Sequence, residues 1–249
     1  MKNQTTILWA IFMCCGLGLK AQGQVIRLTT ETTEVTVTPI RHATMQITYG
    51  EVVMVTDPHD MEGVDDLQAP TLVLITDIHG DHLDIEALRA LGAQGTTIVA
   101  PQAVADKLSA EFGQVIVLAN GDTQLVQGVA IEAVPMYNLP EDESSRHPKG
   151  RGNGYVLTMG GKRIYISGDT EDIEEMRALS SIDLAFVCMN LPYTMDVDAA
   201  ADAVLAFKPK VVVPYHYRGK GGLSDVDRFK SIVGAGSDQV EVVLLNWYP

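Results

Sequence analysis

Cysteine and aromatic residues are scarce in this chain. Its 249 residues include three cysteines and only 6% aromatic residues. Cys14 and Cys15 lie near the N-terminus, which leaves Cys188 alone in an apolar segment typical of a buried strand. A disulfide framework is therefore not expected, and stability must come from the packing of an aliphatic core. No linker, repeat or low-complexity run interrupts the sequence, and its length suits one large domain.

Positive charge is scarce as well. The 18 lysines and arginines face 32 aspartates and glutamates, which gives a formal net charge of −14 at pH 7. A surface of this charge repels nucleic acid and anionic lipid through its long-range field. We therefore predict a small-molecule substrate and no nucleic-acid partner. The sequence leaves a homo-oligomer open.

Long apolar runs are lacking, apart from one near the N-terminus. The run Ile7–Leu19 follows Lys2 and precedes the small residues Ala21–Gly23. It is shorter than the about 20 residues that a membrane span requires, and the whole pattern is typical of an export signal. We predict a signal peptide over residues 1–23 and a mature domain without a membrane span over residues 24–249. The predicted location is the bacterial periplasm or the medium.

Three alternatives for this N-terminal segment stay open. It could form a buried helix, or it could remain attached as a membrane anchor. Lipidation at Cys14 would make the protein a lipoprotein, but Ile11–Met13 lacks the small residues that such processing favours. Export in soluble form is therefore the preferred interpretation.

The periodicity of apolar residues predicts two runs of strands with helices between them. Strands are predicted over Val25–Thr29, Glu34–Thr38, Met45–Thr48, Glu51–Thr56, Leu72–Ile75, Ala130–Val134, Tyr155–Met159, Arg163–Ile166, Leu184–Cys188, Val211–Val213 and Val240–Leu244. Helices are predicted over Leu83–Leu91, Pro101–Phe112, Glu171–Leu179, Val197–Phe207 and Asp225–Val233. Two sheets with helices on their outer faces would bury these strands, so we expect an α+β fold arranged as a four-layer αββα sandwich.

The segment Thr76–His82 is the main functional signal in the sequence. It follows the apolar strand Leu72–Ile75 and places two carboxylates and two imidazoles within six residues, Asp77 to His82. A loop at the end of a buried strand can hold such groups in fixed geometry. These donors suit zinc, iron or manganese rather than a thiolate-selective metal. The structural alternative is a helix start near Leu83 capped by an aspartate, which does not require two histidines.

At these residues the chain resembles the metallo-β-lactamase-fold hydrolases. The family signature is His-x-His-x-Asp-His, and this chain has Asp-x-His-x-Asp-His, so one ligand position differs. The later family ligands are a third histidine, an aspartate in a strand-Gly-Asp-Thr turn and a last histidine after another strand; they match His147, Asp169 and His216. The resemblance covers nearly all of the predicted mature chain.

Within that superfamily, three segments resemble the branch of ascorbate-6-phosphate lactonase-like proteins. They are His42–Thr44, Val55–Pro58 and the His-Pro-Lys-Gly segment His147–Gly150. The third of these precedes a Gly-Tyr strand, as it does in that branch.

The resemblance implies a centre for two divalent ions, zinc or manganese, with iron as an alternative. One ion would be held by Asp77, His79 and His147, the other by Asp81, His82 and His216, and Asp169 would lie between them. The ions would supply a hydroxide nucleophile near neutral pH and polarise the bond under attack. Asp81, which would orient the hydroxide, and Asp169 are the predicted catalytic residues. The carboxylate of Asp77 is a harder donor than imidazole and favours manganese or iron at the first position.

Several further residues are predicted to contact the substrate. Lys149 and Arg151 lie beside the third histidine, Tyr215 and Arg218 lie beside the last one, and His42 would line the cleft. The alternative for Lys149 and Arg151 is that they are ordinary solvated loop residues. Their local concentration of positive charge in an acidic chain predicts a carboxylate or phosphate on the substrate.

The predicted function is an exported metal-dependent hydrolase of a small anionic lactone, ester or phosphodiester. β-Lactam hydrolysis is an alternative, although Asp77 and the His147–Gly150 segment favour another branch. A single-ion enzyme, or a metal-binding scaffold that has lost the reaction, also stays open.

Overall fold

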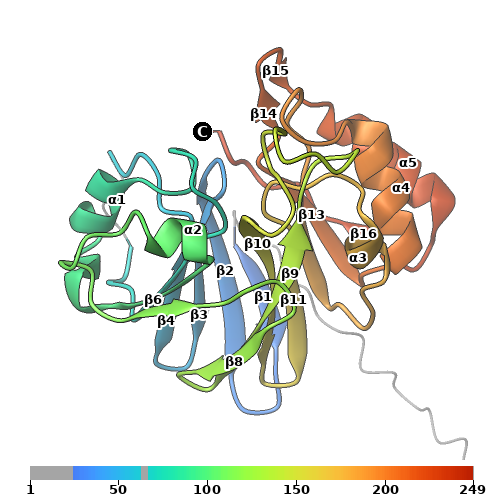
Figure 1. Cartoon of the computed structure of the whole chain (residues 1–249). Coiled ribbons are helices and arrows are strands. Elements are labelled where there is room, and N and C mark those ends of the chain that lie inside the picture. The colour runs from blue at the N-terminus through green and yellow to red at the C-terminus, as the bar shows by residue number, and fades with distance from the viewer. Residues whose placement is uncertain (1–24, 63–66, 249) are drawn as a thin grey trace, which may run out of the picture.

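Two seven-stranded sheets form the centre of the molecule, and helices cover their outer faces (Figure 1). The computed structural model describes residues 25–62 and 67–248. The predicted signal peptide lies outside the described residues. No helix in the described ranges is long and apolar enough to cross a membrane. The four-layer α+β sandwich predicted from the sequence is confirmed.

The first sheet comes from the N-terminal half of the chain. Its strands, in spatial order, are β1 (Ile26–Thr29), β2 (Glu34–Arg41), β3 (Thr44–Tyr49), β4 (Val52–Thr56), β5 (Leu72–Leu74), β6 (Thr97–Ala100) and β7 (Val115–Val117). Strands β1 to β4 are antiparallel and β4 to β7 are parallel. The short helices beside this sheet are α1 (Ile85–Ala90), η1 (Ala93–Gly95) and α2 (Gln102–Ala105). Leu88 of α1, Val104 of α2 and Phe112 share one apolar cluster with Val73 and Ile98 of the sheet.

The second sheet comes from the C-terminal half. Its strands, in spatial order, are β16 (Glu241–Val242), β13 (Val211–Tyr215), β12 (Leu184–Cys188), β11 (Lys162–Ile166), β10 (Gly152–Met159), β9 (Val129–Met136) and β8 (Thr123–Val126). Its helices are α3 (Glu174–Arg177), α4 (Val197–Phe207) and α5 (Val226–Gly236), and a small hairpin joins β14 (Arg218–Gly219) to β15 (Gly222–Leu223). Each sheet is therefore one continuous half of the sequence, which Figure 1 shows as blue to green and green to red.

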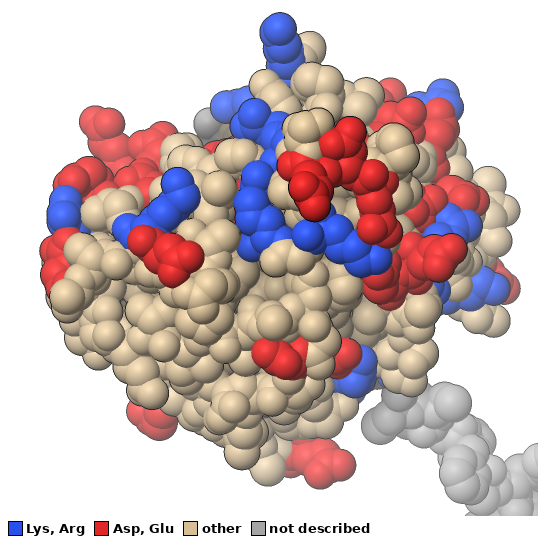
Figure 2. All heavy atoms as spheres, in the orientation of Figure 1, with Lys and Arg blue, Asp and Glu red and all other residues tan. Residues whose placement is uncertain are grey.

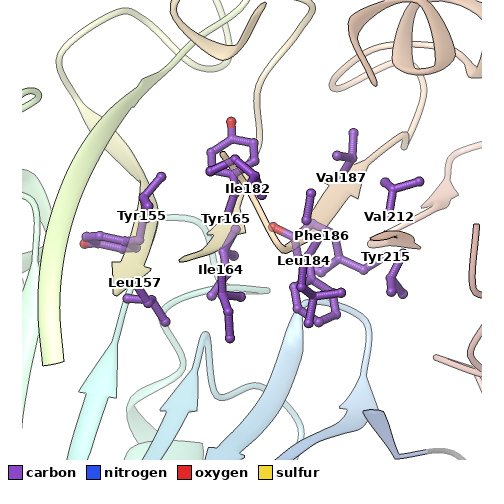
Figure 3. Close-up of a cluster of buried hydrophobic side chains, with 14 of the residues drawn as sticks. Tyr155, Leu157, Ile164, Tyr165, Ile182, Leu184, Phe186, Val187, Val212 and Tyr215 are labelled. Atoms are coloured by element: carbon purple, nitrogen blue, oxygen red, sulfur yellow. The ribbon is translucent and has the colours of Figure 1, made fainter. Parts of the chain in front are cut away.

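The main core lies on both faces of the second sheet. Figure 3 shows Ile164 pointing to one face of the sheet and its neighbour Tyr165 to the other, as the two-residue period of a strand requires. Tyr165 packs edge-on against Phe207 of α4, with ring centroids 5.9 Å apart. Every residue of β12 is buried, because helices cover one face of the sheet and the first sheet covers the other.

Two predicted helices are longer than the observed ones, and five observed strands were not predicted. The predicted helix Pro101–Phe112 is only the single turn of α2, because Phe112 is buried in the apolar cluster beneath and the chain must bend to reach it. The predicted helix Glu171–Leu179 begins only at Glu174, since the Glu171 amide donates to Tyr137 instead. Strands β6, β7, β8, β14 and β15 were not predicted.

The helix start near Leu83 exists beside the acidic and imidazole loop. Asp84 is the N-cap of α1, and its side chain accepts hydrogen bonds from the amides of Glu86 and Ala87. The capping alternative thus accounts for Asp84 alone. Asp77, His79, Asp81 and His82 need another explanation.

Candidate metal centre

The predicted ligands lie on loops that follow strands of both sheets. Asp77, His79, Asp81 and His82 follow β5, His147 lies between β9 and β10, Asp169 follows β11 and His216 follows β13. The structure brings all seven together, although they span 140 positions of the sequence from residue 77 to 216. Both sheets therefore contribute donors to one centre.

One group of donors consists of Asp77, His79 and His147. Asp77 Oδ2 lies 2.5 Å from His79 Nδ1 and 4.0 Å from His147 Nε2. Two donors that each bind one ion at about 2.1 Å with a tetrahedral angle lie about 3.4 Å apart. The three atoms are thus close enough to surround one ion.

A second group consists of His82, Asp169 and His216. Their donor atoms are 3.1 to 3.4 Å apart: His82 Nε2 to His216 Nε2 3.2 Å, His216 Nε2 to Asp169 Oδ1 3.1 Å and His82 Nε2 to Asp169 Oδ2 3.4 Å. Asp81 Oδ2 completes the group at 3.6 Å from His216 Nε2. Asp169 Oδ2 also lies 3.3 Å from His147 Nε2. Asp169 therefore lies between the two groups.

The residues fit a divalent cation. His147 Nε2 and Asp169 Oδ1 are buried and make no hydrogen bond, a costly state for polar atoms without another partner. His82 Nε2 and His216 Nε2 face each other at 3.2 Å, so at most one of them can carry a hydrogen between them. An ion accounts for both observations, and imidazole with carboxylate suits zinc, manganese or iron.

The electrostatics of the pocket also favour a cation. Burial lowers the pKa of His82, but Asp169 and Asp57 outweigh burial and raise that pKa well above its ordinary value. Burial raises the pKa of Asp169, yet His216 and His82 hold it well below its ordinary value. The pKa of Asp81 is lowered too, against burial, by the hydrogen bond to His42. Both carboxylates are thus charged at neutral pH and attract positive charge.

Asp57 orients His82 through the ring nitrogen that faces away from the centre. The sequence analysis assigned no role to Asp57. It is fully buried and accepts hydrogen bonds from Thr76 N, Thr76 Oγ1 and His82 Nδ1 at 2.7, 2.7 and 2.9 Å. The Nδ1 hydrogen of His82 is thereby committed, which leaves Nε2 free to face an ion. The only signal in the sequence was the Asp-Pro pair at the end of a strand.

Asn138 has the same role for His147. Its Oδ1 accepts from the backbone amide of His147 at 2.8 Å and lies 3.1 Å from His147 Nδ1. Its amide nitrogen donates to Glu171 and to the carbonyl of Tyr193. The side chain is therefore fixed, and His147 Nε2 points at Asp169.

A chain of hydrogen bonds runs from the C-terminal segment to Asp81. The Arg218 amide donates to Tyr248 Oη at 3.0 Å, Tyr248 Oη lies 2.8 Å from His42 Nδ1, and His42 Nε2 lies 3.3 Å from Asp81 Oδ2. Burial is the main cause that lowers the pKa of His42 to about 4. Neutral His42 can then accept from Tyr248 and donate to Asp81, so it orients Asp81.

Tight backbone geometry supports the loops of the centre. His42 and His216 both adopt left-handed conformations, with φ of 56° and 46°, and the His216 amide donates to the His42 carbonyl at 3.2 Å. Such conformations cost about 1–3 kcal/mol each and persist where the surroundings hold them. Gly168 has φ of 62°, and a Cβ there would lie 2.6 Å from Met136 Sδ, which explains the glycine before Asp169.

The predicted substrate residues have different surroundings. Lys149 pairs with Glu141 and Glu175 at 3.0 Å each. Tyr215 is buried in the core and accepts from the Gly168 amide, so its prediction as a substrate contact is wrong. His216 lies just beyond the end of β13 with a left-handed backbone, φ of 46°, so its side chain turns into the centre while that of Tyr215 stays in the core.

The two arginines among these residues lie around the donor groups. Arg151 pairs with Asp77, and the Arg218 guanidinium lies 4.1 Å from the centroid of the Tyr248 ring. His42 Nε2 contacts Asp81 Oδ2. The roles of these residues in substrate binding stay predictions.

Comparisons with known proteins agree with this fold. Residues 36–216 match the model of the beta-lactamase superfamily domain. A UPF0173 metal-dependent hydrolase of Pyrococcus abyssi is 34% identical over 199 residues, which cover 77% of this chain and 83% of that protein. The crystal structure of a Parabacteroides distasonis protein assigned as a metal-dependent hydrolase has a TM-score of 0.80 and 38% identity, and covers 89% of this chain and 98% of that one.

A more distant structure shares the fold. The metallo hydrolase Igni18 of Ignicoccus hospitalis has a TM-score of 0.71 at 23% identity, and covers 86% of this chain and 96% of that one. The chain belongs to the metallo-β-lactamase superfamily, and within it to the metal-dependent hydrolases related to the Pyrococcus protein. It is a metal-dependent hydrolase. The lactonase-like branch stays a prediction.

Proposed function

We propose that this metal-dependent hydrolase is exported and cleaves a small anionic lactone, ester or phosphodiester. The observation that carries the proposal is the pair of donor groups joined by Asp169 and open on one side. His82, His147 and His216 are fully buried, whereas the side chains of His79 and Asp81 are 23% and 33% exposed. A substrate would therefore approach past His79 and Asp81.

The residues around the centre would have different roles in hydrolysis. When bound, zinc, manganese or iron would lower the pKa of a coordinated water and polarise the oxygen under attack. Asp81, held by His42, is placed to orient the attacking water. Asn190 Nδ2 lies 3.4 Å from His216 Nε2, and its Oδ1 accepts from Thr194 Oγ1. The fixed amide can donate to negative charge that develops on the substrate.

Basic side chains near the centre favour an anionic substrate. Figure 2 shows Lys and Arg side chains gathered on the upper face, between the two halves seen in Figure 1. Arg218 follows His216 by two residues, with its guanidinium over the Tyr248 ring, whereas Arg151 borders the first donor group and is already paired with Asp77. Guanidinium groups bind carboxylate and phosphate well because they donate two parallel hydrogen bonds.

Metal analysis and a substrate panel test the proposal. We expect the purified protein to contain zinc, manganese or iron, and to hydrolyse at least one of a panel of lactones, carboxylate esters and phosphodiesters in a chelator-sensitive way. Asp81→Asn should lower turnover by at least about 100-fold, whereas Asp84→Asn, on the capping residue, should change it little. A metal-loaded protein inert on the whole panel would contradict the proposal. A mature N-terminus at Gln24 would support export, and an uncleaved chain would oppose it.

A further inference from the structure

The first donor group contains an arginine as well as its three predicted ligands. Arg151 Nε lies 3.2 Å from Asp77 Oδ1, and Arg151 Nη2 lies 3.2 Å from Asp77 Oδ2. These two parallel hydrogen bonds use both oxygens of a carboxylate that is fully buried. Arg151 Nη2 also donates to the carbonyl of Arg146. The guanidinium is therefore fixed on Asp77.

This ion pair stands at the one position where the chain differs from the His-x-His-x-Asp-His signature. A carboxylate replaces a neutral imidazole there, and the guanidinium compensates its negative charge. The pair is neutral as a whole, but its positive part lies beside the place where an ion would bind. Like charges in a partly buried site repel strongly. An ion at Asp77 must also share both carboxylate oxygens with Arg151.

The second donor group has no such competitor. Among the described residues, the basic side chains within 4.0 Å of Asp81 and Asp169 are all histidines, namely His42, His82, His147 and His216. A histidine can lose its proton to solvent and bind an ion as neutral imidazole, whereas an arginine stays charged at every accessible pH. The charges of Asp81 and Asp169 are thus available to an ion, and the charge of Asp77 is already paired.

We propose that the two ion positions are unequal and that Arg151 sets the difference. The position formed by Asp81, His82, Asp169 and His216 binds its ion first and tightly. The position at Asp77, His79 and His147 binds a second ion weakly, because Arg151 competes for Asp77. This inference rests on the proposed metal-dependent function, and it concerns the order and affinity of the two ions.

Stepwise titration of the chelator-stripped protein with Zn²⁺, and separately with Mn²⁺, measures both affinities by calorimetry against a competing chelator. We expect one tight step and a second at least about tenfold weaker in the wild type. Arg151→Gln should tighten the weak step by at least about tenfold and leave the tight step within about threefold. Arg151→Lys, which keeps the positive charge, should preserve most of the inequality.

Arg146→Gln is the matched control. The Arg146 guanidinium lies over the Tyr193 ring, 4.5 Å from its centroid, and only its backbone carbonyl contacts Arg151. Its removal should leave both steps unchanged. If Arg151→Gln does not fold, as judged by circular dichroism of the metal-free protein, the double variant Asp77→His with Arg151→Gln replaces it. That variant restores the imidazole of the signature and should bind two ions tightly.

The outcomes separate this inference from the proposed function. Two steps of equal affinity in the wild type would overturn the inference and leave the proposed function intact. A weak step that Arg151→Gln leaves unchanged or weakens further would also overturn it, since Arg151 would then support Asp77 as a ligand. If Arg151→Lys tightened the weak step as much as Arg151→Gln does, the positive charge of Arg151 would not be the cause of the weak binding. If no divalent ion binds tightly to any variant, the proposed function fails as well.

Discussion

Asp57 connects three groups that the metal centre needs in fixed places. It receives hydrogen bonds from the backbone and hydroxyl of Thr76, at the end of the ligand-bearing strand, and from the imidazole of His82. Its backbone is left-handed, with φ of 41°. The carboxylate thus fixes both the start of the ligand loop and the orientation of one ligand.

Asp57→Asn should therefore weaken ion binding without removing a ligand. The amide can still contact Thr76, but it is a weaker partner for the Nδ1 hydrogen of His82. Loss of such a supporting carboxylate typically lowers metal affinity by about 10–100-fold, and calorimetric titration would measure this. Asp60→Asn, on a half-exposed carboxylate of the same loop, should bind ions as the wild type does. Equal affinities for Asp57→Asn and the wild type would show that His82 is oriented by other contacts.

At the scale of single residues, the sequence predicted the metal ligands better than the residues that orient them. Residues 77–82 and Asp169 each follow an apolar strand directly, so the residue types and the strand context occur together in the sequence. Asp57 and Asn138 act through contacts with residues that are 25 and 9 positions away, and one chain without a fold does not show them. The error for Tyr215 came from its proximity to His216 in sequence, because β13 ends at Tyr215 and the left-handed backbone of His216 sends the next side chain to a different place.

Trp247 anchors the C-terminal segment against the second sheet. It is fully buried, and its ring centroid lies 6.1 Å from that of Phe186 on β12 and 5.7 Å from that of Tyr215 on β13. The next residue is Tyr248, which contacts His42. One aromatic side chain thus fixes the segment that supports Asp81.

Trp247→Ala should lower the free energy of unfolding by about 3–5 kcal/mol, because it leaves a large cavity in the core. Denaturant unfolding of the metal-free protein would measure this change. Leu223→Ala in β15, where the side chain is 57% exposed, should cost little. A loss below about 1 kcal/mol for Trp247→Ala would show that the segment can leave without disturbing the sheet.

The bounds of an element could be predicted where a strand is buried on both faces, or where a helix is long enough to show its apolar periodicity clearly. Helix α4 and strand β12 have the predicted bounds. Strands β7 and β8 are three and four residues long and partly exposed, so they show no apolar run or strict alternation. Their place at the edges of the two sheets depends on pairing with distant strands, which local periodicity does not reveal.

At the scale of the whole molecule, bound ions would join the two halves. The first sheet supplies the loop with Asp77, His79, Asp81 and His82, and the second supplies His147, Asp169 and His216. Unfolding separates these donors, so ions bind the native state far better than the unfolded chain. Ion binding must therefore raise the stability of the protein.

Removal of metal should lower the melting temperature by about 5–10 °C. An ion at 100 times its dissociation constant contributes about 2.7 kcal/mol, and 1 kcal/mol corresponds to about 2–4 °C in a domain of this size. Scanning calorimetry with and without a chelator would measure the shift. His216→Gln should abolish most of it, whereas His59→Gln should keep it. A melting temperature that does not respond to the chelator would contradict this role of the ions.

The division of the sheets has a consequence for how the polypeptide can be cut. Only the five-residue turn 118–122 joins β7 to β8, and three of its residues, Ala119, Gly121 and Asp122, are exposed. A nick in this turn would leave two fragments that each retain a full set of paired strands and part of the ligand set. Reassembly of such fragments would depend on the concentration of divalent cations, which makes the molecule a natural starting point for a split reporter of those cations.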